Sequence, residues 1–407
     1  MKLTGKQMRT LVGCFIGMGV GIHSLPLYTQ GLFVLPLGSS FGWSRLQVSF
    51  GGTILVVALA LSSPVAGALA DRYPLNRLIL ASAAAIGVSF TLLAMTSANI
   101  LTFYGSMALM AVLGSACSSL SFSAIVSRNF DRRRGAALGF TLMGTGVANT
   151  IAPIALGGLI AHAGWRAAYL AQAGVMAASL IPLWLLLPKD GPPPRDKHTS
   201  ALGSSSREAL SGALRQREIW IMGAAFLLIT LAVSGLVGHF VPLLVDAGMS
   251  PVQASARVAI VGASVVICRL GVGVAVDRLP ATRVAAVILL ASAVGIGAMA
   301  RFGPSASIFA AIATGASVGM EIDLIGYLAS RYVDPSVFGR VYGILYTLCL
   351  VGVAASPLLY AWIFGSTRSY HLALVGATAI LVIAALLFCL MRPYREPSAP
   401  TDFQGAG

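Results

Sequence analysis

The chain has 407 residues, of which 57% are hydrophobic and only 10% are charged, and its mean hydropathy is +0.86. Soluble domains carry about 25% charged residues, so this composition excludes a soluble enzyme, a secreted disulfide-rich domain and a disordered chain. A net charge of +14 would suggest a nucleic-acid partner in a soluble protein, but here we attribute it to the bias of Lys and Arg toward the cytoplasmic loops of membrane proteins.

Long apolar segments recur along the whole chain, each close in length to the roughly 20 residues that cross a bilayer as a helix. Breaks at charged, proline and glycine-rich turns predict twelve spans. In chain order they cover residues 11–37, 47–70, 77–97, 101–127, 135–161, 167–187, 218–246, 253–276, 283–301, 306–330, 339–363 and 371–391. The sequence therefore predicts an all-α integral membrane protein embedded in the lipid bilayer.

One long polar stretch separates the sixth span from the seventh, and its run of three prolines, Pro192 to Pro194, is typical of a linker. The predicted organisation is an N-terminal six-helix bundle over 1–187, a cytoplasmic linker over 188–217, a C-terminal six-helix bundle over 218–391 and a cytoplasmic tail over 392–407.

The two halves repeat each other around one loop. The sequence GALADR at residues 67–72, closed by Arg77, recurs as GVAVDR at residues 273–278, closed by Arg283. The aspartates, Asp71 and Asp277, and the closing arginines are both 206 residues apart. A duplication of six-helix units predicts two pseudo-symmetric bundles with a substrate site between them, near the membrane midplane.

The basic residues indicate the orientation of the chain. When both termini are placed in the cytoplasm, 21 of the 27 Lys and Arg residues fall in the tails and inner loops and five fall at or near the outer side. This asymmetry follows the positive-inside rule. We therefore expect both termini to be cytoplasmic, and we expect the membrane to be a bacterial inner membrane.

Twelve spans in two halves, with GxLxDRxxxxR-like loops after the second and eighth spans, resemble the major facilitator superfamily over essentially the whole chain. The resemblance implies the fold of that superfamily and a cytoplasmic gate at the two loops. Ion pairing and helix-end charge would close this gate. The residues expected there are Asp71, Arg72, Arg77, Asp277, Arg278 and Arg283.

Two segments resemble one branch of that superfamily. Residues 28–37 (YTQGLFVLPL) and 41–45 (FGWSR) are similar to the first span and outer loop of monocarboxylate-transporter and oxalate/formate-antiporter relatives, and residues 268–271 (CRLG) resemble the position of their substrate-carboxylate arginine. The resemblance implies transport of a small organic anion. Two departures are Val265, where animal monocarboxylate transporters carry an Asp, and the absence of a second cation from the eleventh span. A single intramembrane cation, Arg269, favours a monoanion.

Arg269 is also singled out by its physical chemistry. A guanidinium inside a span costs about 2.5–3.5 kcal/mol on insertion scales, so it faces the bundle interior or water. It stays charged and offers a planar fork that matches a carboxylate. We expect Arg269 to bind the substrate; a permanent ion pair with Glu321 and snorkelling to the cytoplasmic interface are the structural alternatives.

Glu321 and Asp323 are acids deep within the tenth span. At a spacing of two they point to opposite sides of a helix, whereas Asp323 and Tyr327 share a face. A carboxyl group removed from water takes up a proton more readily, which is what proton coupling requires. We expect one of the two acids to carry the proton, with a structural bond to an arginine or a helix end as the alternative.

Other polar residues in the spans are weaker candidates, because neutral histidines and aromatic residues in helix bundles often only pack. His23 titrates in the right range for proton transfer and is also a candidate for substrate contact, and His239 lies in the seventh span, the repeat partner of the first. The remaining candidates for substrate contact are Tyr28, Tyr327, Tyr342, Tyr346 and Asn149. The five cysteines are widely spaced and form no CxxC motif, so we predict no disulfide framework, no metal and no cofactor.

We predict a secondary active transporter of small organic anions, above all monocarboxylates, with proton symport and a monomeric state. The alternative within the same fold is a proton-coupled drug or metabolite exporter, although the fifth span lacks two glycines of the usual exporter motif around Pro153. A membrane sensor would need an appended signalling domain, and an enzyme would need a catalytic triad, metal cluster or phosphate-binding loop, so we expect neither.

Overall fold

The computed structural model describes residues 4–70, 72–130, 134–189, 211–276, 278–333 and 337–392. The N-terminal bundle contains a first span built from α1 (Gly5–Val20), α2 (Leu25–Thr29), the 3-10 helix η1 (Gln30–Phe33) and α3 (Val34–Phe41). It continues with α4 (Arg45–Ala70), α5 (Leu75–Ala94), α6 (Ile100–Gly114), α7 (Ser119–Asn129) and α8 (Arg134–Leu186). The C-terminal bundle contains α10 (Arg217–Asp246), α11 (Pro251–Val276), α12 (Ala281–Phe302), η3 (Gly303–Ala306), α13 (Ser307–Tyr332), α14 (Phe338–Thr367) and α15 (His371–Cys389).

These helices carry all twelve predicted spans. The described residues contain ten helical stretches long and apolar enough to cross a membrane, and two of them, Ala137–Leu186 and Ala281–Tyr332, hold two predicted spans each. In α8 the chain turns between its two spans at Gly164, whose φ of 82° favours glycine. The prediction of a twelve-helix fold in two bundles is therefore confirmed.

The first and fourth spans differ from the prediction, because each is broken in the middle. The first span breaks over residues 21–24, between α1 and α2, and the fourth breaks over residues 115–118, between α6 and α7. The two breaks contact each other, since the Ile22 N–H donates a hydrogen bond to the Cys117 carbonyl at 3.0 Å. A Cβ atom on Gly21 would lie 2.8 Å from the same carbonyl oxygen. Irregular backbone is tolerated at this depth only where protein or a cavity surrounds it.

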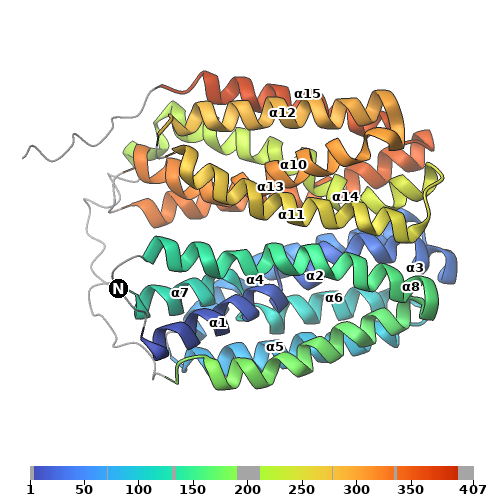
Figure 1. Cartoon of the computed structure of the whole chain (residues 1–407), viewed down its shortest axis with the longest axis horizontal. Helices are drawn as coiled ribbons and strands as arrows, with labels where there is room; N and C mark the ends of the chain where they lie inside the picture. The colour runs from blue at the N-terminus through green and yellow to red at the C-terminus, as the bar shows by residue number, and fades with distance from the viewer. Residues whose placement is uncertain are drawn as a thin grey trace, which may run out of the picture.

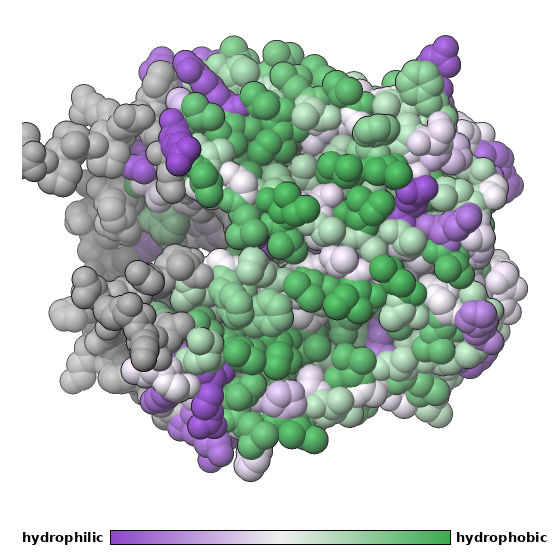
Figure 2. Space-filling model, viewed as in Figure 1, coloured by the Kyte–Doolittle hydropathy of each residue, from purple (hydrophilic) through white to green (hydrophobic). Residues whose placement is uncertain are grey.

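Figure 1 shows the two bundles lying side by side, with their helices running roughly along the long axis of the molecule. The bundles pack against each other along two helix pairs, α8 with α11 and α4 with α14. We call the end that carries Arg72 and Arg278 the linker end, and the end that carries Arg45, Asp246 and Tyr370 the far end. Figure 2 shows hydrophobic residues on the flank and hydrophilic ones gathered toward both ends, as a multi-pass membrane protein requires.

Candidate functional site

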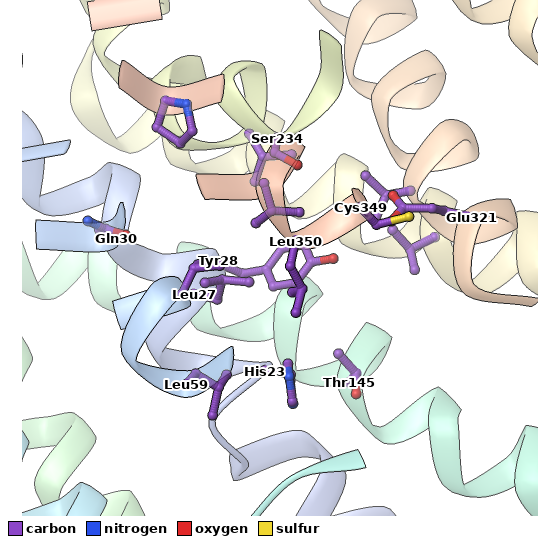
Figure 3. A pocket seen from close by; sticks show the side chains of 18 of the residues that line it. His23, Leu27, Tyr28, Gln30, Leu59, Thr145, Ser234, Glu321, Cys349 and Leu350 are labelled. Atoms are coloured by element: carbon purple, nitrogen blue, oxygen red, sulfur yellow. The ribbon is translucent and has the colours of Figure 1, made fainter. Parts of the chain in front are cut away.

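A cavity lies between the two bundles, and both bundles line it. The N-terminal bundle contributes side chains around the break of the first span, from α4, from the start of α7 and from α8; the C-terminal bundle contributes α10, α11, α13 and α14. Leucine and valine residues supply much of the lining. Polar lining residues are His23, Tyr28, Gln30, Ser49, Ser119, Thr145, Ser234, His239, Arg269, Glu321, Tyr342, Tyr346 and Cys349. Figure 3 shows several of them pointing toward one central space from helices far apart in the sequence.

Arg269 lines this cavity from α11, in the middle of an otherwise apolar stretch. Its Nη1 donates a hydrogen bond of 3.4 Å to the Leu142 carbonyl of α8, so the guanidinium reaches the opposite bundle. The contact places this charge at the interface of the two bundles, in the wall of the cavity. A planar cation in such a position can hold a carboxylate through two parallel hydrogen bonds.

Glu321 lines the same cavity from α13, with only 8% of its surface exposed. Its carboxyl group is close enough to Arg269 to feel the charge of the guanidinium. Within the described part of the chain, none of the recorded hydrogen bonds or ion pairs involves the Glu321 carboxylate. Figure 3 shows it beside Cys349 of α14. The second acid, Asp323, belongs to the same helix, but its side chain lies outside what the structure describes.

Three tyrosines add hydroxyl groups and flat apolar surface to the wall. Tyr28 extends from α2 and lies within electrostatic range of both Arg269 and Glu321. Tyr342 and Tyr346, one turn apart on α14, are stacked with ring centroids 6.1 Å apart and an angle of 6° between their planes. Such a surface suits an apolar or aromatic substrate body next to the charged groups.

His23 lies at the break of the first span, where the backbone leaves the helix and turns the side chain toward the cavity (Figure 3). Its Nδ1 is buried and has no hydrogen-bond partner among the described residues. An unsatisfied buried nitrogen is costly unless water or a ligand completes it. The break therefore adds a polar group at the N-terminal side of the cavity.

Two of the predicted substrate contacts are not brought into this cavity. Asn149 is buried in α8 and accepts a hydrogen bond from the Ser24 hydroxyl at 3.1 Å, which ties α8 to the break of the first span. Tyr327 accepts a hydrogen bond from Arg331 at 3.1 Å and donates one to the Val276 carbonyl at the end of α11. The contacts of Asn149 with Ser24 and of Tyr327 with Val276 join separate helical segments, whereas the contact of Tyr327 with Arg331 lies within α13.

The far end holds a polar network that the sequence does not reveal. Arg45 of α4 forms two hydrogen bonds, of 2.6 and 2.7 Å, with the carboxylate of Asp246 at the end of α10. The same guanidinium donates to the Tyr370 hydroxyl at 2.7 Å and lies 3.8 Å from the centroid of the Phe364 ring. Tyr370 in turn contacts His239, which lines the cavity. This network joins the two bundles and closes the far end.

The two repeated loops at the linker end have the same backbone geometry. Pro74 before α5 and Pro280 before α12 have φ/ψ angles of −57°/124° and −57°/125°. The arginines Arg72, Arg77, Arg278 and Arg283 are exposed. Asp71 and Asp277 lie outside the described residues, so the ion pairs expected at this gate stay a prediction.

Several cavity residues were not anticipated from the sequence, among them Gln30, Ser49, Thr145, Ser234 and Cys349. Small polar residues are common in membrane helices, where they also mediate helix packing, so nothing in their spacing marks a site. Gln30 gives the clearest structural reason for its place, since a Cβ atom on Gly52 of α4 would lie 2.2 Å from its side-chain oxygen. The glycine makes room for the Gln30 amide.

Comparison with known proteins adds three kinds of similarity. A family model described as Major Facilitator Superfamily matches residues 10–348. The chain is 26% identical over 328 residues to the "Uncharacterized MFS-type transporter YhjX" of Escherichia coli (strain K12), covering 79% of this chain and 80% of the relative. It is 25% identical over 385 residues to "Monocarboxylate transporter 11" of Homo sapiens, covering 89% of this chain and 78% of the relative.

A more local match is to "Multidrug resistance protein MdtG" of Yersinia enterocolitica, 31% identical over 180 residues, covering 43% of this chain and 42% of the relative. Among solved structures, a bacterial homolog of the human lysosomal transporter Spinster, inward-facing and unoccupied, superposes with a TM-score of 0.73 at 15% identity, covering 95% and 97% of the two chains. The D-xylose-proton symporter superposes with a TM-score of 0.72 at 14% sequence identity, covering 96% of this chain and 97% of the symporter. At these identities the solved structures establish the fold alone.

Proposed function

The chain belongs to the Major Facilitator Superfamily, and from that premise we propose that it transports small organic anions, above all monocarboxylates, together with protons. The transport is secondary active transport by alternating access, in which the two bundles expose the central cavity first to one side of the membrane and then to the other. We further propose that the protein works as a monomer in a bacterial inner membrane, with both termini in the cytoplasm.

The observation that carries this proposal is the position of Arg269. It brings a permanent positive charge from α11 into the cavity wall between the bundles, within electrostatic range of Tyr28 and Glu321. A charge at this depth is expensive and typically functional. Its guanidinium fork is suited to one carboxylate, and the aliphatic and aromatic wall around it is suited to an apolar substrate body.

Proton coupling is supported by Glu321. Its carboxyl group is buried in the same wall and is held by no recorded hydrogen bond within the described residues. When the group is ionised, it repels the carboxylate of an incoming substrate and competes with it for Arg269. When the group is protonated, this repulsion and this competition disappear. Substrate and proton therefore favour each other's binding, as symport requires.

The state of the structure is consistent with one half of this cycle. The far end is closed by Arg45, Asp246 and Tyr370, whereas Figure 2 shows a hollow between the bundles near the linker end. If the linker end is cytoplasmic, as the positive-inside bias favours, this is the state that releases an imported substrate.

The test is uptake of labelled lactate, pyruvate and benzoate into proteoliposomes, with and without an outside-acid pH gradient. We expect the gradient to stimulate uptake by the wild-type protein, and we expect Arg269→Gln to abolish it. Arg257→Gln is the matched control, because Arg257 lies on the same helix and is not among the residues that line the cavity. The control is expected to keep wild-type uptake.

Two results would contradict the proposal at different points. Uptake that survives Arg269→Gln would leave a carboxylate transporter but remove Arg269 from the substrate site. Failure of the wild-type protein to accumulate any acid of the panel would reject the substrate class itself.

The second candidate is a proton-coupled exporter of drugs or metabolites. It is favoured by the local similarity to a multidrug resistance protein and by the leucine and valine residues that supply much of the cavity lining. A cation in the cavity is unfavourable for the cationic substrates of many exporters. Efflux of a cationic dye driven by the proton gradient, in vesicles that show no uptake of acids, would favour the exporter.

A further inference from the structure

His239 lies between the cavity and the network that closes the far end. The side chain belongs to α10, is fully buried and lines the cavity. Its Nε2 lies 3.0 Å from the Pro357 carbonyl of α14 and 3.1 Å from the Ser49 hydroxyl of α4. Its Nδ1 lies 2.9 Å from the Tyr370 hydroxyl. One imidazole ring therefore contacts three elements, and the contact with Ser49 crosses from one bundle to the other.

The partners of this ring determine where its proton lies. A carbonyl oxygen can only accept, so Nε2 carries the hydrogen that points to Pro357. A neutral imidazole has one N–H, and Nδ1 is then an acceptor that receives the hydroxyl hydrogen of Tyr370. The Tyr370 oxygen accepts in turn from Arg45 at 2.7 Å. Burial raises the pKa of Tyr370 to about 12, so its hydroxyl keeps its hydrogen.

The hydrogen bonds therefore run in one direction. Arg45 donates to Tyr370, Tyr370 donates to His239, and His239 donates to Pro357. The direction is fixed at both ends, because a guanidinium cannot accept and a carbonyl cannot donate. The closed far end thus contains a histidine whose neutral form satisfies every member of the chain.

A second proton on His239 disrupts this arrangement. A hydrogen on Nδ1 would point at the Tyr370 oxygen, which already accepts from Arg45, and the Tyr370 hydrogen would lose its acceptor. The protonated ring would also place a positive charge on one side of a hydroxyl that has the Arg45 guanidinium on its other side.

No second negative charge compensates for this cation within the described part of the chain. The titratable and charged groups that face His239 are Arg45 from α4, Asp246 from its own helix, Tyr360 from α14 and Tyr370 from the turn before α15. The only carboxylate in this set, Asp246, already forms both of its short hydrogen bonds with Arg45.

We propose that His239 is a proton-binding site whose occupation opens the far end of the transporter. The closed conformation of the far end lowers the affinity of His239 for a second proton. By thermodynamic linkage, binding of that proton destabilises the closed conformation by the same free energy. His239 would be a second proton site, in addition to Glu321. The proposal rests on the proposed function only in treating proton movement as part of transport. Release of the proton from His239 would let the far end close again.

The test measures the separation of the two bundles at the far end as a function of pH. Ser39 at the end of α3 and Ser366 at the end of α14 are exposed. In a background without the five native cysteines, S39C and S366C carry spin labels for pulsed EPR distance measurement in proteoliposomes. We expect longer distances to gain population between about pH 8 and about pH 5, a range that brackets the ordinary pKa of histidine, about 6.5.

Two variants and one control assign this shift to His239. His239→Gln keeps a carbonyl to accept from Tyr370 and an amide to donate to Pro357, but it does not titrate, so the acid shift should disappear. Tyr370→Phe keeps the ring that packs on Phe364 and removes the hydroxyl over which the two donors compete, so the shift should shrink. His371→Gln replaces an exposed histidine at the same end and should keep the wild-type shift.

An acid shift that persists undiminished in His239→Gln overturns the proposal and points to Glu321, which that variant retains. Absence of a shift in the wild-type background overturns it as well. The outcome is separable from that of the proposed function, because the distance measurement needs no substrate. If the protein takes up none of the labelled acids, the distance measurement can still show an opening of the far end at acid pH.

Discussion

Gly31 offers the sharpest test of how the far end closes. It lies in η1 of the N-terminal bundle, directly against the backbone of α10 in the other bundle. A Cβ atom at this position would lie 2.5 Å from the Gly238 carbonyl oxygen and 3.0 Å from its carbon. Carbon and oxygen atoms normally approach to about 3.3 Å, so Gly31→Ala must push η1 and α10 apart by about 0.8 Å.

That displacement destabilises only the conformation in which the far end is closed. Forcing an extra methyl group into a packed contact typically costs about 1–3 kcal/mol. The strain is relieved once the bundles separate at the far end, so the substitution acts on the equilibrium between conformations and leaves the unfolding of either bundle largely unaffected. A free energy of this size changes the ratio of far-closed to far-open molecules by a factor of about 5–150.

The assay is the same pulsed EPR distance between labels at positions 39 and 366, recorded at a single pH. Gly31→Ala should move population from the short to the long distance and slow the delivery of substrate at the linker end. Gly105→Ala is the control, because Gly105 is exposed on α6 and a Cβ atom there meets nothing within 4 Å. If the two variants give the same distance distribution, the closed far end does not depend on this backbone contact, and the reasoning fails.

Three further predictions concern other parts of the molecule. Asp246→Asn removes the charge that holds Arg45; because the two side chains are 16% and 33% exposed, we expect a loss of about 1 kcal/mol or less, seen as a modest rise of the far-open population at every pH. Phe33→Ala removes a buried ring stacked on Tyr169, with ring centroids 3.9 Å apart. It should lower the free energy of unfolding by about 3–5 kcal/mol, measured as a lower thermal unfolding midpoint in detergent. Phe309→Ala is the control, because this side chain is 63% exposed and its loss should change the midpoint little. Glu321→Gln should remove the stimulation of uptake by a pH gradient while keeping exchange of labelled for unlabelled substrate, and gradient-driven accumulation by this variant would exclude Glu321 as the proton carrier.

The fold could be predicted from the sequence because its signals are local and periodic. Apolar segments of membrane-spanning length and the repeated loop at 67–72 and 273–278 are visible without knowledge of any contact. The breaks at residues 21–24 and 115–118 could not be predicted, because each break is stabilised by contact with the other. Gly21 and Ile22 meet Cys117, nearly a hundred residues later, and the hydrogen bond between them replaces one that a continuous helix would have made.

The candidate site was predictable to the extent that its residues are chemically unusual where they stand. Arg269 and Glu321 are conspicuous because charges are rare in apolar spans, and both line the cavity. Asn149 and Tyr327 are weaker candidates because they are neutral; the hydrogen bond of Asn149 ties α8 to the break of the first span, and that of Tyr327 with the Val276 carbonyl ties α13 to the end of α11. The role of a neutral polar group depends on which helix faces it, and sequence spacing within one helix does not contain that information.

His239 illustrates the same limit from the other side. As a single histidine in an apolar helix it is most simply interpreted as a packed, neutral residue, and the partners of both its ring nitrogens fit the neutral form. Its significance comes from Arg45, 194 residues earlier, and Tyr370, 131 residues later, because these two partners determine what a second proton would disrupt.

The charges of the cavity are distributed unequally between the two bundles. Arg269 and Glu321 both belong to the C-terminal bundle, whereas the described N-terminal bundle offers the cavity only neutral and titratable side chains such as His23, Tyr28 and Ser49. If Arg269 binds the substrate, as proposed above, the electrostatic attraction comes from the C-terminal bundle, and the N-terminal bundle contributes shape and hydrogen bonds. We expect that contribution to come from the broken first span, because its residues His23 and Tyr28 line the cavity together with Arg269.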